Sequence, residues 1–175
     1  MFWDCDKMEI GLGLGSNLDH RLDYLRGAVT RLAELPGTHV VAKAPIYETD
    51  PVDAKPEYAH LEYLNTVIIV ESTMELQAFS DAIHQIETDM GRVRSEDRNA
   101  PRPIDIDILY AGKVQRADGI LDLPHPRWAQ RRFVLQPLAD VRPFLKLPGE
   151  PRTISDVLKS LPPSNIRLFR AQQQW

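Results

Sequence analysis

The apolar run YLNTVIIVE, residues 63–71, constrains the fold of this chain more than any other stretch. After its first residues it consists almost wholly of Val and Ile, without the polar alternation of a strand that faces water on one side. Such a run is typical of a strand that is buried on both faces. We therefore expect a central strand in a sheet, with other elements packed against each side of it.

Two amphipathic helices are predicted on either side of this strand in the sequence. Residues 18–35 carry leucine and valine at spacings of three and four and end at Pro36-Gly37, and their capping candidates are Ser16, Asn17 and Asp19. Residues 76–90 repeat the pattern and end at Gly91, and the candidate cap before them is the Ser-x-x-Glu signal of Ser72 and Glu75.

The order of the predicted elements indicates the fold class. Strands are expected at residues 8–17, 38–49, 63–71 and 104–112, which with the two helices gives strand, helix, strand, strand, helix, strand. This order predicts an α+β, ferredoxin-like split βαβ sandwich with a mainly antiparallel sheet and helices on its faces. A loop, a short helix and an apolar segment are expected within 121–141, and a last helix at 153–161. We expect a single domain over residues 1–175, with loose termini at 1–8 and 170–175.

Composition favours a soluble intracellular protein. No apolar run approaches the roughly 20 residues that span a bilayer, and the first residues lack the pattern of a signal peptide. The single cysteine, Cys5, offers neither a disulfide nor a zinc site. The net charge of −4 disfavours binding to nucleic acid or an anionic membrane. We expect a cytoplasmic monomer without a membrane or nucleic-acid partner.

Asp105 and Asp107 lie two residues apart in the aliphatic stretch PRPIDIDILY, residues 101–110. Because side chains alternate along a strand, both carboxylates face one side and the isoleucines face the other. Like charges so close repel each other, and Asp is a poor strand former, so a positive partner is expected beside them. Two interpretations remain open: ion pairs with nearby arginines, or coordination of Mg²⁺, which prefers carboxylate oxygens.

Basic residues concentrate in two stretches despite the negative net charge. Residues 91–103 contain Arg92, Arg94, Arg98 and Arg102, and residues 125–132 contain His125, Arg127, Arg131 and Arg132. Two arginine clusters in an acidic protein favour a small anionic ligand. Arginine binds phosphate bidentately and metal ions bridge phosphate oxygens, so the clusters and the aspartates together predict phosphoryl or nucleotidyl transfer.

Two further patterns have competing interpretations. In GLGLGSN the glycines Gly11, Gly13 and Gly15 are spaced by two, which does not match a dinucleotide-binding fingerprint and favours close backbone packing in a strand. Residues Tyr63, Asn65 and Phe133 can be ordinary strand and core residues. Two aromatic rings and an amide are also a set that binds a planar heterocycle.

Five motifs stand in the same order as those of a known family: GLGSNL, YETDPV, YLNTVIIVEST, ETDMGRVRSEDRNAPRPIDIDIL and LPHPRWAQRRFVLQPLADV. Over roughly residues 9–147 the chain resembles the 6-hydroxymethyl-7,8-dihydropterin pyrophosphokinases. The resemblance implies an enzyme of folate biosynthesis that transfers the β,γ-diphosphate of ATP to the pterin hydroxymethyl oxygen and releases AMP. The alternatives are a nucleotide- or RNA-binding module without catalysis and a Mg²⁺-dependent nucleotidyltransferase.

The resemblance also implies roles for individual residues. Asp105 and Asp107 are expected to hold two Mg²⁺ ions, and Arg92 and Arg102 are the expected catalytic arginines. ATP binding is expected from Glu87, Arg92, Arg94, Arg102, Ile108, His125 and Arg131. Pterin binding is expected from Asp50, Val52, Tyr63, Asn65 and Phe133.

Four positions depart from the pattern of many family members. Asn99 stands where Trp is frequent, Asp53 where Gly is frequent, Pro126 where Tyr is frequent, and Arg132 where a small residue is frequent. None of them removes an expected metal ligand or a principal arginine. We therefore expect an active enzyme in which loop closure and substrate affinity are the properties affected.

Overall fold

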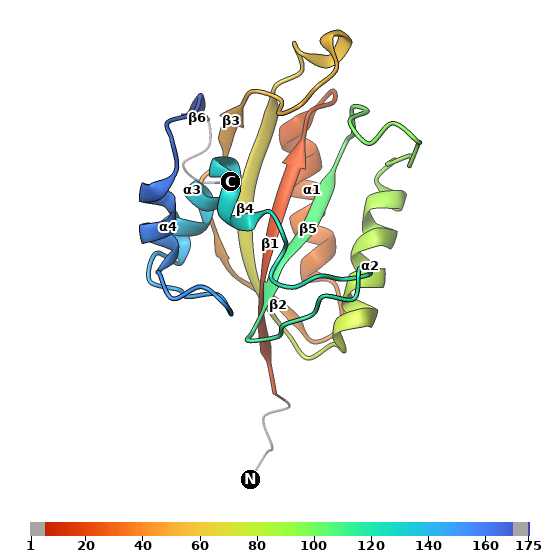
Figure 1. Cartoon of the computed structure of the whole chain (residues 1–175). Helices are drawn as coiled ribbons and strands as arrows, with labels where there is room; N and C mark the ends of the chain where they lie inside the picture. The colour runs from red at the N-terminus through yellow and green to blue at the C-terminus, as the bar shows by residue number, and fades with distance from the viewer. Residues whose placement is uncertain (1–5, 170–174) are drawn as a thin grey trace.

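The computed structural model describes residues 6–169 and Trp175, and within them the chain forms one six-stranded sheet with helices on both faces (Figure 1). The strands are β1 (Met8–Ser16), β2 (Thr38–Lys43), β3 (Tyr47–Thr49), β4 (Tyr63–Ser72), β5 (Asp105–Ala111) and β6 (Ile166–Leu168). The α-helices are α1 (Arg21–Ala33), α2 (Leu76–Asp89), α3 (Arg132–Val141) and α4 (Ile154–Ser160), and single 3₁₀ turns span Pro56–Tyr58 and Trp128–Gln130. Among the described residues, no helix has both the length and the apolar character needed to cross a membrane.

The sheet confirms the predicted ferredoxin-like arrangement. Its strand order is β5-β1-β4-β3-β6, β2 also pairs with β4, and these pairings are antiparallel. The expected strand at residues 38–49 is divided into β2 and β3, because Pro45 cannot donate a ladder hydrogen bond. The central strand is β4, as expected, with β1 along one edge and β2 and β3 along the other.

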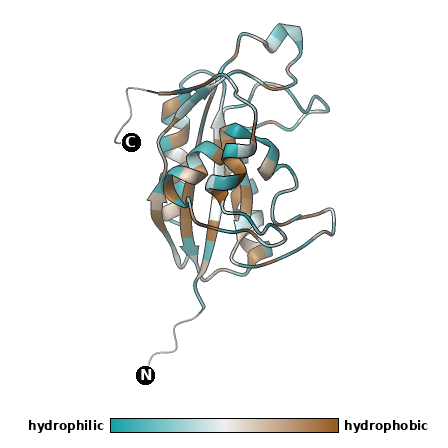
Figure 2. Ribbon diagram, turned by 60° about the vertical axis from the view of Figure 1, so that its left-hand side comes forward, coloured by the Kyte–Doolittle hydropathy of each residue, from teal (hydrophilic) through white to brown (hydrophobic). Residues whose placement is uncertain are grey.

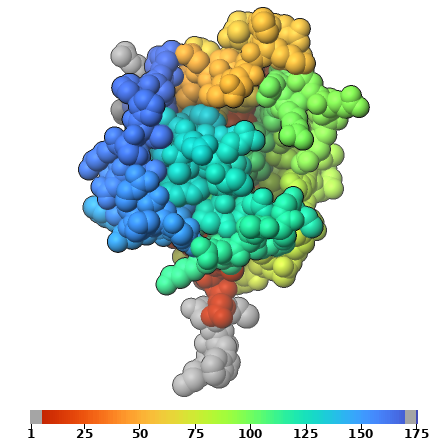
Figure 3. Space-filling model, in the orientation of Figure 1, coloured from red at the N-terminus to blue at the C-terminus, as the bar shows by residue number. Residues whose placement is uncertain are grey.

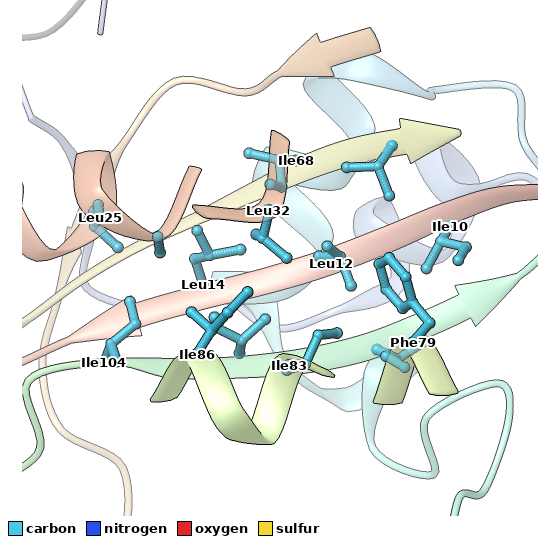
Figure 4. Packing of buried hydrophobic residues seen from close by; sticks show 14 of the residues in the cluster. Ile10, Leu12, Leu14, Leu25, Leu32, Ile68, Phe79, Ile83, Ile86 and Ile104 are labelled. Atoms are coloured by element: carbon cyan, nitrogen blue, oxygen red, sulfur yellow. The ribbon is translucent and has the colours of Figure 1, made fainter. Parts of the chain in front are cut away.

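One face of the sheet is covered by α1 and α2. Figure 4 shows Ile10, Leu12 and Leu14 of β1 packed against side chains of both helices, which include Leu25, Leu32, Phe79, Ile83 and Ile86. Leu12, Leu25 and Phe79 are fully buried. Each such side chain contributes about 1.5–3 kcal/mol through removal from water, so this layer accounts for much of the driving force for folding.

The other face of the sheet is partly covered by α3 and α4. Val67 and Ile69 of β4 are buried there with Leu135 of α3 and Val157 of α4. Figure 2 turns these two helices toward the viewer and shows hydrophilic and hydrophobic residues alternating along them. The burial of β4 on both faces confirms the interpretation of its apolar run. Because α3 and α4 cover only part of this face, the rest of it remains open for a site.

The predicted caps are wrong for α1 and confirmed in part for α2, where Glu75 of the predicted signal is the capping residue. Helix α1 begins at Arg21 after His20, and the Asn17 side chain instead accepts a hydrogen bond from the Arg102 backbone N–H at 2.8 Å. Helix α2 is capped by Glu75, whose carboxylate accepts the N–H groups of two first-turn residues. Ser72 belongs to β4, and its hydroxyl bonds the Thr38 hydroxyl at 2.8 Å. Asn17 and Ser72 thus bond partners distant in sequence, Arg102 and Thr38, and neither side chain caps a helix.

The chain termini are ordered further than expected at two residues. Met8 pairs with Ser72 in the sheet, so the expectation of a loose N-terminus fails at this position. Trp175 Nε1 donates a hydrogen bond to the Ala44 carbonyl at 2.8 Å, which corrects the expectation for the last residue. The remaining expectations for Cys5 and for residues 1–5 and 170–174 lie outside the described residues.

Candidate active site

A cavity of about 630 Å³ opens on the sheet face that α3 and α4 leave uncovered. Its floor is formed by β1, where Gly13 lies in register with Asp107, and Gly15 in register with both Asn65 and Asp105. Its walls come from residues 50–53, the loop between α2 and β5, and residues 127–134. Figure 3 shows a hollow bordered by the gold, green and teal segments that carry these walls.

The glycines of β1 leave this face of the strand without side chains. A Cβ atom on Gly15 would lie 2.8 Å from Asn65 Oδ1, and one on Gly11 would lie 2.1 Å from a ring carbon of Tyr110. The prediction of close packing is therefore confirmed. Gly13 and Gly15 form the floor of the cavity, whereas Gly11 packs against Tyr110, and Leu12 and Leu14 belong to the core of the opposite face.

The aspartate pair lies on β5 with the predicted alternation. Asp105 and Asp107 line the cavity, whereas Ile106 and Ile108 are buried in the core beneath α1 and α2. Asp105 is paired with Arg92 at 2.5 Å and with Arg102 at 3.7 Å. Among residues 6–169 and Trp175, no cation lies within ion-pair distance of Asp107. Burial first, and then the charge of Asp105, raise the pKa of Asp107, so this carboxylate favours a cation beside it.

The loop between α2 and β5, residues 90–104, is called the arginine loop below. Glu87 lies behind this loop and positions Arg92. Its carboxylate is 2% exposed, accepts the backbone N–H of Ile106 at 2.8 Å, and bonds Arg92 Nη1 at 2.5 Å. Burial raises the pKa of Glu87, although these donors oppose the shift. Burial acts to lower the pKa of Arg92, but Asp105 and Glu87 outweigh it and the pKa is raised. Glu87 does not line the cavity; it holds an arginine that reaches Asp105.

The backbone of Arg102 is fixed to the end of β1. Its N–H donates to Asn17 Oδ1 at 2.8 Å, and the Asn17 N–H donates to its carbonyl at 3.4 Å. The guanidinium group bonds the backbone carbonyls of Ala100, at 3.2 Å, and Arg98. The position of this arginine is therefore set by the sheet, while its side chain bonds only its own loop and the cavity carboxylate Asp105.

A second basic group borders the cavity near η2 (Trp128–Gln130). Within the described residues, Arg127 and Arg131 have no carboxylate within ion-pair distance. Burial and then Arg127 lower the pKa of Arg131, and burial, Arg131 and Arg127 lower that of His125. His125 Nδ1 accepts the Arg127 backbone N–H at 3.1 Å, so the neutral ring carries its proton on Nε2. This concentration of positive charge and donors suits a polyanionic ligand.

The expected aromatic and amide residues also meet in the cavity. Tyr63, Asn65 and Phe133 all line it. The Asn65 side-chain N–H₂ donates to Thr49 Oγ1 at 2.7 Å, which fixes the orientation of the amide. The Arg131 guanidinium lies 5.5 Å from the centre of the Phe133 ring. Asp50 and Val52 border the same space, so the whole expected pterin set shares one cavity.

Five of the seven expected ATP residues do not line this cavity: Glu87, Arg92, Arg94, Ile108 and His125. Ile108 is buried in the core on the opposite face of β5, and Leu109, the next residue, lines the cavity. Arg94 is 64% exposed and borders a smaller recess of about 240 Å³ within the arginine loop. His125 does not line the cavity itself. The sequence interpretation did not assign a role to several residues that do line it: Thr49, Arg98, Leu109, Arg127 and Gln130.

A signal for two of these residues, Arg98 and Arg127, was present in the sequence, because both lie in the basic stretches. Arg127 lies in the second basic stretch, as does Arg131, which was expected to bind ATP. Thr49 lies directly opposite Tyr63 in the β3–β4 pair, but this relation depends on strand register and cannot be read from local sequence.

Two of the unusual positions contact each other. Asn99 Nδ2 donates to the Asp53 carbonyl at 3.1 Å, and Lys55 Nζ pairs with Asp97 at 2.7 Å. These contacts link the loop of residues 50–62 to the arginine loop above the cavity. Asp53 adopts a φ of 55°, in the left-handed region that Gly occupies most readily.

Arg132 has a structural role outside the cavity. Its guanidinium donates to the carbonyls of Leu158 at 3.4 Å, Leu161 at 2.9 Å and Pro162 at 3.3 Å, at the C-terminal end of α4. Carbonyls at a helix end have few partners within the helix, so Arg132 ties α3 to the end of α4.

A divalent ion would have two carboxylate ligands here. Within the described residues, no three His, Cys, Asp or Glu side chains gather around one point. Asp105 and Asp107 on one strand face fit Mg²⁺, which is commonly held by one or two carboxylates with the remaining oxygens from phosphate and water.

Comparisons with known proteins identify the family. A profile described as "7,8-dihydro-6-hydroxymethylpterin-pyrophosphokinase (HPPK)" matches residues 11–143. The chain is 39% identical to a 2-amino-4-hydroxy-6-hydroxymethyldihydropteridine pyrophosphokinase of Methylorubrum extorquens, over 89% of this chain and 94% of that protein. It is 34% identical to the Pseudomonas aeruginosa protein of the same name, over 86% and 90%.

A solved structure supports the fold. The crystal structure of wild-type HPPK-DHPS of Plasmodium falciparum with pteroate matches with a TM-score of 0.68 at 15% identity. The match covers 88% of this chain and 44% of that longer chain, and at this identity it shows a likeness of fold. The profile match and the relatives over nearly full length show that the chain belongs to the 7,8-dihydro-6-hydroxymethylpterin-pyrophosphokinase family.

Proposed function

We propose that this chain carries out the family reaction, transfer of diphosphate from ATP to the hydroxymethyl group of 6-hydroxymethyl-7,8-dihydropterin, in the cavity above β1. The observation that carries the proposal is that one cavity unites two kinds of wall. One wall has Asp105, Asp107 and basic side chains, and the other has Tyr63, Asn65 and Phe133. A charged phosphate chain and a planar ring can therefore bind side by side.

The pterin would occupy the aromatic side of the cavity. Tyr63 and Phe133 offer ring faces for stacking. Because the Asn65 N–H₂ group is bonded to Thr49, its Oδ1 atom is oriented as an acceptor for an N–H group of the pterin. Asp50 and Val52 would close the edge of the ring.

The ATP phosphates would lie between the aspartate pair and the basic residues. Arg92 and Arg102 approach from one side, and Arg131, with His125 behind it, from the other. Bound Mg²⁺, for which two ions are expected, would neutralise negative charge on the phosphates and on the leaving group. Asp105 and Asp107 would be its protein ligands.

The chemistry would depend on alignment and electrostatics. The hydroxymethyl oxygen attacks the β-phosphorus, the bond from that phosphorus to the α,β-bridging oxygen breaks, and AMP leaves while the hydroxyl proton passes to solvent. Arginines placed around the transferred group stabilise its charge without a dedicated base. Arg92 and Arg102 are the proposed catalytic residues because their guanidinium groups already lie beside Asp105.

The proposed site is complete within one chain. The cavity of this chain contains carboxylates, arginines and aromatic residues, so the proposed reaction requires no group from a second copy, and a monomer is proposed as the active unit. The acidic net charge of −4 supports a small-molecule substrate pair in preference to nucleic acid.

Product analysis tests the proposal. The protein is incubated with ATP and Mg²⁺, with and without 6-hydroxymethyl-7,8-dihydropterin, and nucleotides are separated by chromatography. We expect AMP only when the pterin is present, with a pterin product heavier by one diphosphate group. Release of inorganic diphosphate would indicate nucleotidyl transfer instead. Binding of both substrates without turnover would indicate a binding module.

A further inference from the structure

The C-terminal strand β6 lies outside the segment that the family profile matches, which ends at residue 143. It nevertheless pairs with β3, with Arg167 opposite Glu48. Strand β3 ends at Thr49 and leads directly into the loop of residues 50–62, whose first residues wall the cavity. The strand therefore borders the segment proposed to close over the pterin.

Arg167 contacts both ends of this loop. Its Nη2 atom lies 2.5 Å from Glu62 Oε1 at the end of the loop, and its Nη1 atom lies 3.9 Å from Asp50 Oδ1 at the start. Asn165 adds a hydrogen bond from its Nδ2 to Asp50 Oδ2 at 2.6 Å and accepts one from Arg167 Nη1 at 3.0 Å. One guanidinium group thus joins two residues that are twelve positions apart.

A second arginine holds the same region from α1. Arg21 Nη1 donates to the Glu62 carbonyl at 2.9 Å, and its Nη2 pairs with Glu48 at 2.8 Å. Arg167 Nη2 also lies 3.6 Å from Glu48. The ends of the loop are therefore fixed to a helix and to β6, while its middle residues Val52 and Asp53 are exposed.

We propose that Arg167 and Asn165 are positioning residues for the pterin subsite: they hold the two ends of the 50–62 loop together so that Asp50 and Val52 form its wall. This inference rests on the proposed function for the identity of the substrate. A loop whose ends are fixed loses less conformational entropy when it closes on a ligand, so the contribution should appear in pterin binding. ATP contacts come from other segments and should be unaffected.

Steady-state kinetics of Arg167→Met and Asn165→Ala test the inference. Arg167→Met removes the charge and keeps much of the apolar stem. We expect the KM for the pterin to rise about fivefold, a size that suits a network of partly exposed ion pairs. The KM for ATP and kcat should stay within about twofold. Arg167→Lys, which can still pair with Glu62, should restore most of the pterin affinity.

Arg152→Met is the matched control. Arg152 is 48% exposed, compared with 43% for Arg167, and pairs with Glu150 away from the loop. Loss of this pair should leave both KM values unchanged. Circular dichroism and thermal unfolding confirm that each variant is folded, and Asn165→Ala serves if Arg167→Met is not.

Hydrogen exchange of residues 50–62 in the substrate-free protein gives a readout independent of turnover. We expect faster exchange in Arg167→Met than in the unsubstituted protein or in Arg152→Met. Unchanged exchange together with an unchanged pterin KM overturns the inference. If the unsubstituted protein forms no AMP from ATP in the presence of the pterin, the proposed function fails. Unchanged exchange in Arg167→Met would then still contradict the role of Arg167 in holding the loop.

Discussion

Arg92 Nη1 lies 2.5 Å from Asp105 Oδ1, so a residue proposed to bind phosphate is paired with one proposed to bind metal. Both groups are pre-positioned by other contacts, since Glu87 holds Arg92 and the sheet holds Asp105. When ATP and metal bind, Arg92 can exchange the Asp105 carboxylate for a phosphate group, and Asp105 can exchange the Arg92 guanidinium for the metal ion. Each group thus keeps a partner of opposite charge to its own. The pair therefore keeps the two charges compensated while the cavity contains no substrate.

Replacement of the aspartates should remove the metal site. We expect Asp105→Asn and Asp107→Asn each to lower kcat/KM by about 100-fold, or about 2.7 kcal/mol of transition-state stabilisation. Chelation of Mg²⁺ with EDTA should abolish turnover of the unsubstituted protein. The exposed Asp23→Asn on α1 is a charge-matched control. Near-normal transfer by either variant at ordinary Mg²⁺ would show that the metal assignment is wrong.

Arg102 should act mainly on the transition state. Its backbone is fixed by Asn17, so Arg102→Ala removes the guanidinium group and its bonds to the carbonyls of Arg98 and Ala100 but keeps the backbone attachment to the end of β1. We expect kcat to fall by about 100-fold while the dissociation constant for ATP, measured by calorimetry, changes by less than about fivefold. Equal losses in turnover and in ATP affinity would indicate that Arg102 contributes only to ground-state binding.

Asp107 should make the stability of the metal-free protein depend on pH. Burial and Asp105 raise its pKa from 3.8 to about 7. The native state then binds a proton between about pH 4 and 7 that the unfolded chain does not, so the free energy of unfolding decreases as pH rises through this window. Above pH 7 the full free-energy cost of keeping the ionised Asp107 carboxylate buried is present. Mg²⁺ should offset it, because the metal binds the ionised form.

Urea unfolding of the protein and of Asp107→Asn at pH 5.5 and pH 8 measures this effect. We expect Asp107→Asn to raise the free energy of unfolding at pH 8 by at least about 1 kcal/mol, and to change it less at pH 5.5. The difference between the two proteins isolates this group from other titrations. Parallel pH profiles would contradict the assignment.

Side chains added to the cavity floor should reduce stability in a defined order. A Cβ on Gly15 would lie 2.8 Å from Asn65 Oδ1, which Thr49 holds in place, whereas one on Gly13 would lie 3.4 Å from Leu109. We expect Gly15→Ala to destabilise the protein by about 1–3 kcal/mol, and Gly13→Ala by less. Thermal or urea unfolding of both variants checks this order. Equal stability of the two would show that Asn65 can move at little cost.

The sequence predicted those helices and strands whose patterns involve residues close together in the chain. The apolar run of β4, the alternation around Asp105 and Asp107 and the helical stripes all depend on neighbours within a few residues, and the structure confirms them. The predicted cap of α1 was wrong because Asn17 bonds Arg102, 85 positions away. No local pattern can reveal such a competitor.

The site was predictable in its chemistry and less so in its geometry. The arginines predict an anionic ligand and the aspartates predict a metal cation. The ion pairs among Glu87, Arg92 and Asp105, however, depend on how α2 packs against β5. Strand β6 is only three residues long and has no periodicity to detect. Its pairing with β3, more than a hundred positions earlier, follows only from the folded chain.

The glycine floor has a consequence for how this active site can change. A surface built from backbone alone has no side chain to exchange, so substitution there can only add volume. New substrate preference would therefore have to come from the other lining residues, which β4, β5, α3 and the surrounding loops supply. The backbone of β1 would keep the same position and shape while the residues around it change, so every substrate would rest on the same floor.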